Sequence, residues 1–524
     1  MTPFLQFRVW LRRGPGSERV TAGLAALLLV VVAVWAAIPM DDESTAGIGS
    51  TASVSTGPGE PAATPSGTEP GAGEVTATSS PSEGGTGGTA TGTATGTATG
   101  TATGTAGAAG GGGGSAAQTA TNTCAGLRAT DQGVTANEIF VAVSVVNLGG
   151  DQVNSTVGVR SATDIGNVAQ AIVDQLNADG GVACRKLRIK VYKVNPLDQN
   201  DQRSKCLEIV GDKPYAVIDI AGYTNDSGRS CFREAKVPFE TLVIANEDEA
   251  KNAYPYLFTP QPSGDTALRN WVFGAGERGW FKASNGFRKL GLLLNDCNPK
   301  ANTELLANLE KVGVPEDQTS VFTVSGCGQP TSPNQIGQAL VQHRNADVSH
   351  VFLIGNVTNS QTYVRQADAI RWTPAYLVAD GLGETSPTTA ARWTDGFDGA
   401  RAITSSRAGE QNSGIVAHWV VQCNDWLERR GVAPSETEAD VIPGSVCDGF
   451  RLFAAAANLA GPNLTRATLV ADGLAKVTRF EGAGVLDGLY RPGKVFGSDF
   501  FRATSWHVDC KCWKVIDRGT TPNK

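Results

Sequence analysis

Apolar and polar positions along the chain predict a strand, a helix and a second strand over residues 139–192. Residues 139–146, IFVAVSVV, form a short apolar run rich in β-branched side chains, and the sequence NLGG ends it. Apolar residues then recur at helical spacing from Ile165 to Leu176, before Gly180 and Gly181 supply the glycines with which helices often end. Apolar and polar residues alternate again over 187–192. The three segments together predict a βαβ unit of a parallel sheet.

The same alternation of strands and helices continues through most of the chain. Strands are predicted at 215–220 and 237–244, with helices at 200–211 and 227–236, and a second series has strands at 290–295, 320–324, 348–354 and 375–378. Strands that alternate with helices predict parallel sheets covered by helices on both faces. The roughly 400 residues after position 123 exceed what one hydrophobic core usually organises. The pattern therefore predicts an α/β fold of two Rossmann-like lobes, with a cleft between them of the kind that commonly holds ligands.

The first 123 residues differ in composition from the rest. Residues 1–19 are rich in arginine, and residues 20–38 carry no charge. A segment of that length spans a bilayer with its basic side in the cytoplasm, so we predict a cytoplasmic segment and a transmembrane anchor, with a cleaved signal peptide as the alternative. Residues 39–123 consist mainly of Gly, Ala, Thr, Ser and Pro with repeated TATG units, and they cannot bury enough apolar surface to become ordered. We expect a disordered tether that carries an exported domain over 124–524.

All ten cysteines lie after this tether, in the part of the chain predicted to be exported. Export favours disulfides over free thiols. Because neighbouring elements usually touch, we pair cysteines in sequence order: Cys206 with Cys231, Cys297 with Cys327, and Cys423 with Cys447. Cys124 with Cys184 is a further expected pair, and the partners of Cys510 and Cys512 stay open. Four scattered histidines and the absence of a CxxC motif argue against a structural zinc site.

One glycine-rich motif could indicate a dinucleotide-binding enzyme. Residues 274–279, GAGERG, match GxGxxG, and Asp296 ends an apolar strand as in dinucleotide-binding folds. A strand should precede the first glycine and a long helix should follow the third, but only three apolar residues, 271–273, precede this motif, behind polar residues, and Gly286 follows it too soon. No GxSxG or HExxH motif occurs either. We therefore predict a binding protein without enzymatic activity, cofactor or metal, and the net charge of −7 argues against a nucleic-acid partner.

The first βαβ unit also resembles a known family. Its helix ends in LNADGGV, and the following sequence CRKL leads into a strand. This turn resembles that of the type I periplasmic binding proteins, specifically the branched-chain amino-acid-binding group, and the order of elements is similar from about residue 134 to about residue 517. The resemblance implies two lobes joined by a three-segment hinge. We expect the first lobe at about 124–258 and 395–490, the second at about 264–380 and 494–524, and crossings near 259–263, 381–385 and 491–494.

The resemblance further implies a ligand site at the carboxyl ends of the strands, where parallel sheets bind their ligands. In the family, hydroxyls and backbone amides of the first lobe hold the ligand's carboxylate, and the matching positions here are Leu148, Gly149, Tyr223, Thr224, Thr241 and Leu242. Amino-acid binders of the family pair the ligand's ammonium with a glutamate of the second lobe. That position is Asn359 here, with Asn356 in the same loop, and an amide cannot neutralise an ammonium. Asp296 and Asp380, at predicted strand ends, could replace the glutamate.

These observations predict an extracytoplasmic solute-binding protein. It would be held at the cell membrane by residues 20–38, or secreted if that segment is cleaved. It would capture a small amino acid, carboxylate or amide in the interlobe cleft and present it to the permease of an ABC importer. The alternative is the ectodomain of a ligand-sensing receptor, in which the same lobe closure signals without transport.

Overall fold

The computed structural model describes residues 124, 126–156, 159–220, 222–223, 226–242, 245–296, 298–324, 331–353, 357–379, 383–433 and 441–524. The predictions for residues 1–19, 20–38 and 39–123 lie outside these residues. So do the predicted site residues Thr224, Asn356 and Asp380 and the predicted pair Cys297 and Cys327. Within the described part of the chain, no helix is long and apolar enough to cross a membrane.

The first sheet consists of parallel strands in the order β2-β1-β3-β4-β5. Its interior strand β1 is buried from its second residue onward because helices cover both faces. The strands of this sheet are β1 (Glu138–Val146), β2 (Lys186–Val194), β3 (Ala216–Ile220), β4 (Phe239–Thr241) and β5 (Leu257–Phe258), and the helices between them are α3 (Asp151–Thr156), α4 (Ala162–Ala178), α5 (Gln199–Gly211), α6 (Asp226–Glu234) and α7 (Glu247–Ala253).

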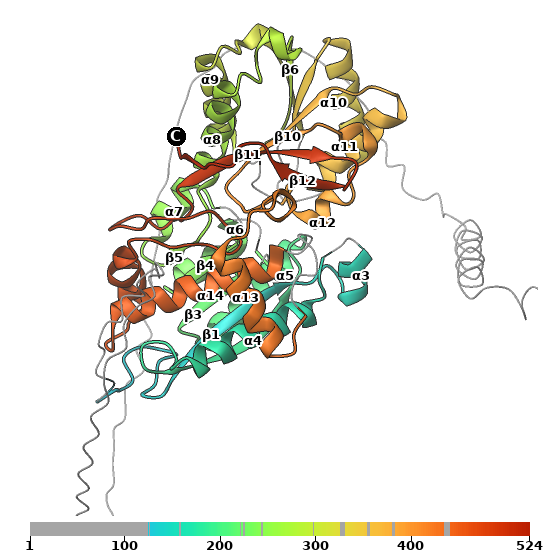
Figure 1. Cartoon of the computed structure of the whole chain (residues 1–524). Helices are drawn as coiled ribbons and strands as arrows, with labels where there is room; N and C mark the ends of the chain where they lie inside the picture. The colour runs from blue at the N-terminus through green and yellow to red at the C-terminus, as the bar shows by residue number, and fades with distance from the viewer. Residues whose placement is uncertain are drawn as a thin grey trace, which may run out of the picture. The chain divides into compact units, whose positions relative to one another are not determined.

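Two later helices complete the first lobe, α13 (His418–Arg429) and α14 (Val441–Ala460). Both pack against α4 (Figure 1). Their apolar side chains join the core of the first sheet. Right-handed crossovers place α5 and α6 on the opposite face, because the chain moves from β2 to β3 in the direction opposite to its move from β1 to β2.

The turn between α4 and β2 shows why its sequence is distinctive. Gly181 has φ 81°, and a Cβ there would lie 2.2 Å from the carbonyl oxygen of Arg185. The buried guanidinium of Arg185 donates hydrogen bonds to the carbonyls of Thr135, Ala183, Arg128 and Pro462, at 2.7–3.1 Å. The glycine permits the tight turn, and the arginine binds it to the rest of the lobe.

The second sheet has the order β12-β11-β10-β9-β8-β6-β7, with β13 paired to β11. Strands β6 to β10 run parallel, whereas β11 and β12 are antiparallel additions from the C-terminus. The strands are β6 (Leu290–Asn295), β7 (Thr319–Val324), β8 (His350–Leu353), β9 (Ala375–Ala379), β10 (Arg401–Thr404), β11 (Phe500–His507), β12 (Cys512–Val515) and β13 (Thr521–Pro522), and the main helices are α8 (Gly264–Glu277), α9 (Pro299–Lys311), α10 (Pro333–Asn345), α11 (Val357–Ala369) and α12 (Pro387–Ala390).

The GAGERG sequence lies at the end of α8 and not in a loop between a strand and a helix. A Cβ on Gly274 would come within 2.8 Å of the Phe501 ring and 3.1 Å of Ile403, so the glycine lets the helix approach the second sheet. Close helix–sheet packing therefore accounts for this glycine.

The lobe boundary predicted near residue 395 needs correction. Residues 401–404 form β10, which pairs with β9 on one side and β11 on the other, so this segment belongs to the second sheet. The strand is only four residues long, and its partner β11 follows about a hundred residues later, so the local pattern of apolar residues did not predict it.

Three segments cross between the lobes side by side, at residues 259–263, 405–407 and 495–498. The amide of Thr259 donates to the carbonyl of Val495 at 3.0 Å, and the amide of Gly497 donates back to Thr259 at 2.9 Å. The Ser498 hydroxyl donates to the carbonyl of Ser405 at 3.2 Å. The crossing expected at 381–385 therefore lies at 405–407, because β10 extends the second lobe.

Four disulfides lie within the described residues. Cys206 is bonded to Cys231, Cys423 to Cys447, and Cys124 to Cys184, as predicted. The first two link neighbouring helices, α5 with α6 and α13 with α14. Cys510 and Cys512, which were left open, are bonded to each other.

Candidate functional site

The carboxyl edges of the two sheets face each other. Helix α7 follows β4 of the first lobe, and helix α9 follows β6 of the second lobe. The carboxylate of Asp248, in the first turn of α7, lies 2.7 Å from the ammonium of Lys300, in the first turn of α9. Because helices that follow parallel strands begin at the carboxyl edge of a sheet, this ion pair places the two edges opposite one another. Ligands of such sheets bind at these edges.

The loop after β1 is held by a buried asparagine. Asn154 donates from its side-chain nitrogen to the carbonyls of Val146, at 3.0 Å, and Arg160, at 3.1 Å. Its side-chain oxygen accepts the amide of Leu148 at 2.8 Å. The Leu148 amide, predicted to bind the ligand, is therefore already engaged within the loop. Gly149, the second predicted residue here, is exposed.

A buried aspartate that the sequence analysis missed organises the loops after β3 and β4. One carboxylate oxygen of Asp219 accepts the hydroxyl of Ser144 at 2.6 Å and the amide of Gly222 at 2.9 Å. The amide of Leu242 donates to the Asp219 carbonyl at 3.2 Å. Burial raises the pKa of Asp219 to about 6. An acid inside the apolar strand sequence AVIDI is the signal that could have identified it.

Two other predicted residues of the first lobe lie in the interior. The ring of Tyr223 packs against Phe232 and Phe239, with ring centroids 5.2 and 6.3 Å away. Thr241 is buried, and its carbonyl accepts the hydroxyl of Thr259 at 2.6 Å, which connects β4 to a crossing between the lobes. Tyr223 and Thr241 therefore belong to the packed interior next to the loops of the predicted site.

In the second lobe, Asn359 is buried and makes two hydrogen bonds to Thr331. Its side-chain oxygen accepts the Thr331 amide at 3.0 Å, and its side-chain nitrogen donates to the Thr331 hydroxyl at 2.9 Å. Asn359 therefore joins the start of α11 to the segment before α10. Asp296 is exposed at the end of β6. Of the predicted residues, Leu242 is joined through Asp219 to β1 and to the loop after β3 that carries Tyr223, whereas Asn359 is bonded within the second lobe.

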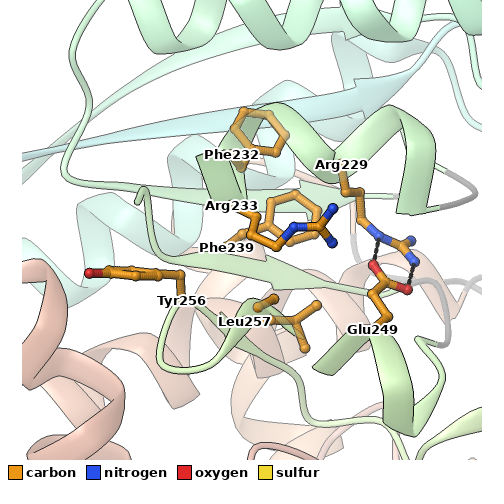
Figure 2. A pocket seen from close by; sticks show the side chains of 8 residues that line it. Arg229, Phe232, Arg233, Phe239, Glu249, Tyr256 and Leu257 are labelled. Atoms are coloured by element: carbon orange, nitrogen blue, oxygen red, sulfur yellow. Dashed lines mark hydrogen bonds and ion pairs between the residues drawn. The ribbon is translucent and has the colours of Figure 1, made fainter. Parts of the chain in front are cut away.

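An ion pair braces the same edge of the first lobe. The guanidinium of Arg229 on α6 donates to both carboxylate oxygens of Glu249 on α7, each at 2.6 Å, and both side chains are only 4% exposed (Figure 2). Arg229 also donates to the carbonyl of Tyr223 at 3.3 Å. The pair thus holds the helix that follows β3 against the helix that follows β4.

Neither space found on the first lobe matches the predicted cleft. The cavity beside Arg229 and Glu249 measures about 10 Å³, which suits a single water molecule and excludes an organic solute (Figure 2). A groove of about 610 Å³ lies along α4 against residues 430–433, on one lobe only, and polar side chains such as Asp164, Asn167 and Gln170 line it.

Comparisons with known proteins support the fold. No protein-family model matches the chain, and no curated protein sequence matches it. Among solved structures, a fatty acid ABC transporter substrate-binding protein from Thermomonospora curvata is 14% identical to this chain, with a TM-score of 0.55. The match covers 76% of this chain and 95% of the other protein. A solute-binding protein of an ABC transporter from Rhodopseudomonas palustris, in complex with 3,4-dihydroxybenzoic acid, is 14% identical with a TM-score of 0.55, covering 74% and 97%. The branched-chain amino acid substrate-binding protein LivJ from Streptococcus pneumoniae, in complex with isoleucine, is 15% identical with a TM-score of 0.54, covering 72% and 99%.

The fold is that of a type I periplasmic binding protein. The match covers nearly the full length of each of these proteins, so both lobes take part in it. The type I fold accounts for the two sheets, their facing carboxyl edges and the three crossings between them.

Proposed function

We propose that this chain is an extracytoplasmic solute-binding protein that closes its two lobes on a small organic molecule and presents it to an ABC importer. One observation carries the proposal: two parallel-sheet lobes, joined by three hydrogen-bonded crossings, turn their carboxyl edges toward each other. This arrangement permits hinge closure around a ligand. The similar proteins are named as substrate-binding proteins of ABC transporters, which supports the importer as partner. Binding without turnover is part of the proposal.

We further propose that the ligand carries a carboxylate. Fatty acids, 3,4-dihydroxybenzoic acid and isoleucine, named with the similar proteins, share this group. In the first lobe, the exposed backbone of Gly149 and the hydroxyl of Thr224 are the proposed donors, because a charge-assisted hydrogen bond to a carboxylate needs no counter-ion. In the second lobe, Asn356 is a proposed polar contact, and Asp296 or Asp380 is the proposed partner of any amine. Asn359, whose side chain bonds to Thr331, stays a further proposed polar contact.

The proposal places the lobes outside the cytoplasm. Three disulfides of the described residues link segments 24 to 60 residues apart, and such bonds persist in oxidising compartments. Residues 20–38 are the proposed membrane anchor or cleaved signal, and residues 39–123 are the proposed tether. Recovery of an importer permease together with the full chain would support transport, whereas recovery of a signalling partner alone would favour a receptor ectodomain.

Mass spectrometry of small molecules released from purified residues 124–524 would identify the class of ligand. Calorimetry should then compare leucine, its deaminated keto acid and 3,4-dihydroxybenzoate with their amides. We expect each carboxylate that binds to bind more tightly than its amide. Thr224→Ala should weaken binding by about 1–3 kcal/mol, because it leaves a carboxylate oxygen without a donor in the closed cleft. Thr303→Ala, at an exposed threonine of α9, is the matched control and should leave affinity unchanged. Amides that bind as tightly as acids would overturn the carboxylate proposal.

A further inference from the structure

The disulfide between Cys510 and Cys512 differs in position and exposure from the two disulfides that link helices. The Cys124–Cys184 disulfide is also accessible, with Cys124 exposed and Cys184 half-buried. Only Lys511 separates Cys510, in the turn after β11, from Cys512, the first residue of β12. Cys510 and Lys511 are exposed, and Cys512 is half-buried. By contrast, the four cysteines that link helices are at most 3% exposed, namely Cys206, Cys231, Cys423 and Cys447. A reagent in solution can therefore reach this bond far more easily than the two buried ones.

The hairpin that carries this bond is held together by other contacts. Strand pairing sets Trp506 opposite Trp513, and both indole rings are buried in the core of the second lobe. The side chain of Asn412 donates to the carbonyl of Trp513 at 3.1 Å, and the amide of Val515 donates to the hydroxyl of Ser413 at 2.8 Å. A disulfide also stabilises a protein less as the loop that it closes becomes shorter, and the loop closed here contains only Lys511 between the two cysteines. Breaking the bond should leave the hairpin folded.

The same framework favours reversible chemistry. The register that pairs His507 with Cys512 sets the ends of the turn, and the Cα atoms of Cys510 and Cys512 are 5.1 Å apart, a separation at which a disulfide forms without backbone movement. The exposed ammonium of Lys511 lies between the cysteines in the chain, and the negative charge of Asp509, which precedes Cys510, is offset by the ammonium of Lys514 at 3.3 Å. Positive charge beside a cysteine favours its thiolate, which makes it a better leaving group in disulfide exchange.

We propose that Cys510–Cys512 is a thiol–disulfide exchange site that accepts two electrons from a dithiol. The thiolate of the dithiol attacks Sγ of Cys510, the bond between the two cysteines breaks, and Cys512 leaves as a thiolate that takes up a proton. The second thiol of the dithiol then loses its proton. The resulting thiolate attacks the sulfur of the dithiol that is bonded to Cys510, and the Cys510 thiolate that is released takes up a proton. The dithiol becomes a disulfide, and the protein gains two thiols.

Redox titration of the intact protein tests this site directly. The protein is equilibrated with mixtures of reduced and oxidised dithiothreitol, free thiols are alkylated, and each cysteine is scored by peptide mass spectrometry. We expect Cys510 and Cys512 to become alkylated together at a reduced-to-oxidised ratio at least 100-fold below that needed for Cys206–Cys231 and Cys423–Cys447. For a two-electron couple this is a difference of about 60 mV. Reduction of all these disulfides at the same ratio, or only in denaturant, would overturn the proposal.

Variants separate exchange from a structural role. Cys510→Ser with Cys512→Ser should leave the melting temperature unchanged, whereas Cys206→Ser with Cys231→Ser should lower it. If both double variants lower it equally, the bond is structural and the proposal fails. Cys512→Ser alone should capture one glutathione from oxidised glutathione, through Cys510, while the double variant at this hairpin captures none. Absence of that adduct would also count against exchange. None of these measurements involves the ligand, so their outcome is independent of the proposed function.

Discussion

At the scale of single residues, Glu240 is the most unusual group in the first lobe. It lies on β4 and is fully buried, and within the described residues neither of its carboxylate oxygens has a hydrogen-bond partner. Burial, followed by the nearby carboxyl groups of Asp219 and Asp448, raises its pKa well above the ordinary value. Glu240 is therefore protonated in the folded protein at pH values where it ionises in the unfolded chain.

This difference predicts a pH-dependent stability. The contribution of Glu240 is fully present below its ordinary pKa and is lost as the pH rises toward the raised pKa of the folded state, because only the unfolded chain can ionise. Glu240→Gln should therefore be more stable than the parent protein at pH 8, by about 1–3 kcal/mol, and should lose this advantage near pH 4.5. Chemical denaturation from pH 4.5 to pH 8 measures this, with the exposed Glu310→Gln as control. A variant less stable than the parent at pH 8 would refute the protonated state.

At the scale of residues, the sequence located the loops and strand ends of the site but not the hydrogen bonds made there. Leu148, Leu242 and Asn359 occupy the expected loops or strand ends, but Asn154, Asp219 and Thr331 already bond to their polar groups. These bonds join residues that are distant or unremarkable in sequence, so periodicity gives no sign of them. A sequence shows which loop lies at a sheet edge, whereas the free amides and hydroxyls of that loop depend on side-chain geometry.

At the scale of elements, the strands of the βα repeats were predictable, including the four-residue β8, whereas β10 was not. The predicted strands at 139–146, 215–220 and 290–295 coincide closely with β1, β3 and β6, because apolar β-branched runs mark strands that are buried on both faces. Strand β10 escaped prediction, since its four residues pair with β11, which lies about a hundred residues later in the sequence. The lobe boundary shifted for the same reason.

The brace between α6 and α7 gives a prediction at this scale. Arg229→Ala should destabilise the protein by about 3–5 kcal/mol, because it leaves the carboxylate of Glu249 buried without its partner. Replacing both residues, by Arg229→Met with Glu249→Leu, should recover much of that loss. Arg203→Ala, which breaks an exposed pair with Glu234 between α5 and α6, is the control and should change little. Urea denaturation compares the variants, and equal losses in Arg229→Ala and Arg203→Ala would show that the buried pair is no brace.

At the scale of the whole molecule, the lobes meet at the three crossings and again at the ion pair between Asp248 and Lys300. Both side chains are about 60% exposed, 64% for Asp248 and 60% for Lys300, so solvent screens their attraction. The pair therefore shows that the carboxyl edges of the two sheets are close, but it contributes little to the stability of that arrangement. The energy of closure must come mainly from the ligand, since a ligand shifts a conformational equilibrium only by its differential affinity for the two states.

Reversing one charge of this pair should hinder closure without altering either lobe. Asp248→Lys places two ammonium groups at the mouth of the cleft, and we expect ligand affinity to fall less than about fivefold at low salt and to recover as salt is added. Asp248→Lys with Lys300→Asp should restore it. Asp347→Lys, which reverses an exposed pair with Arg288 inside the second lobe, should have no effect. Small-angle scattering would show the parent protein compacting at saturating ligand and Asp248→Lys requiring more ligand to do so. An unchanged radius in the parent would argue against closure, and a double reversal as weak as the single one would mean that the pair does not span the closing cleft.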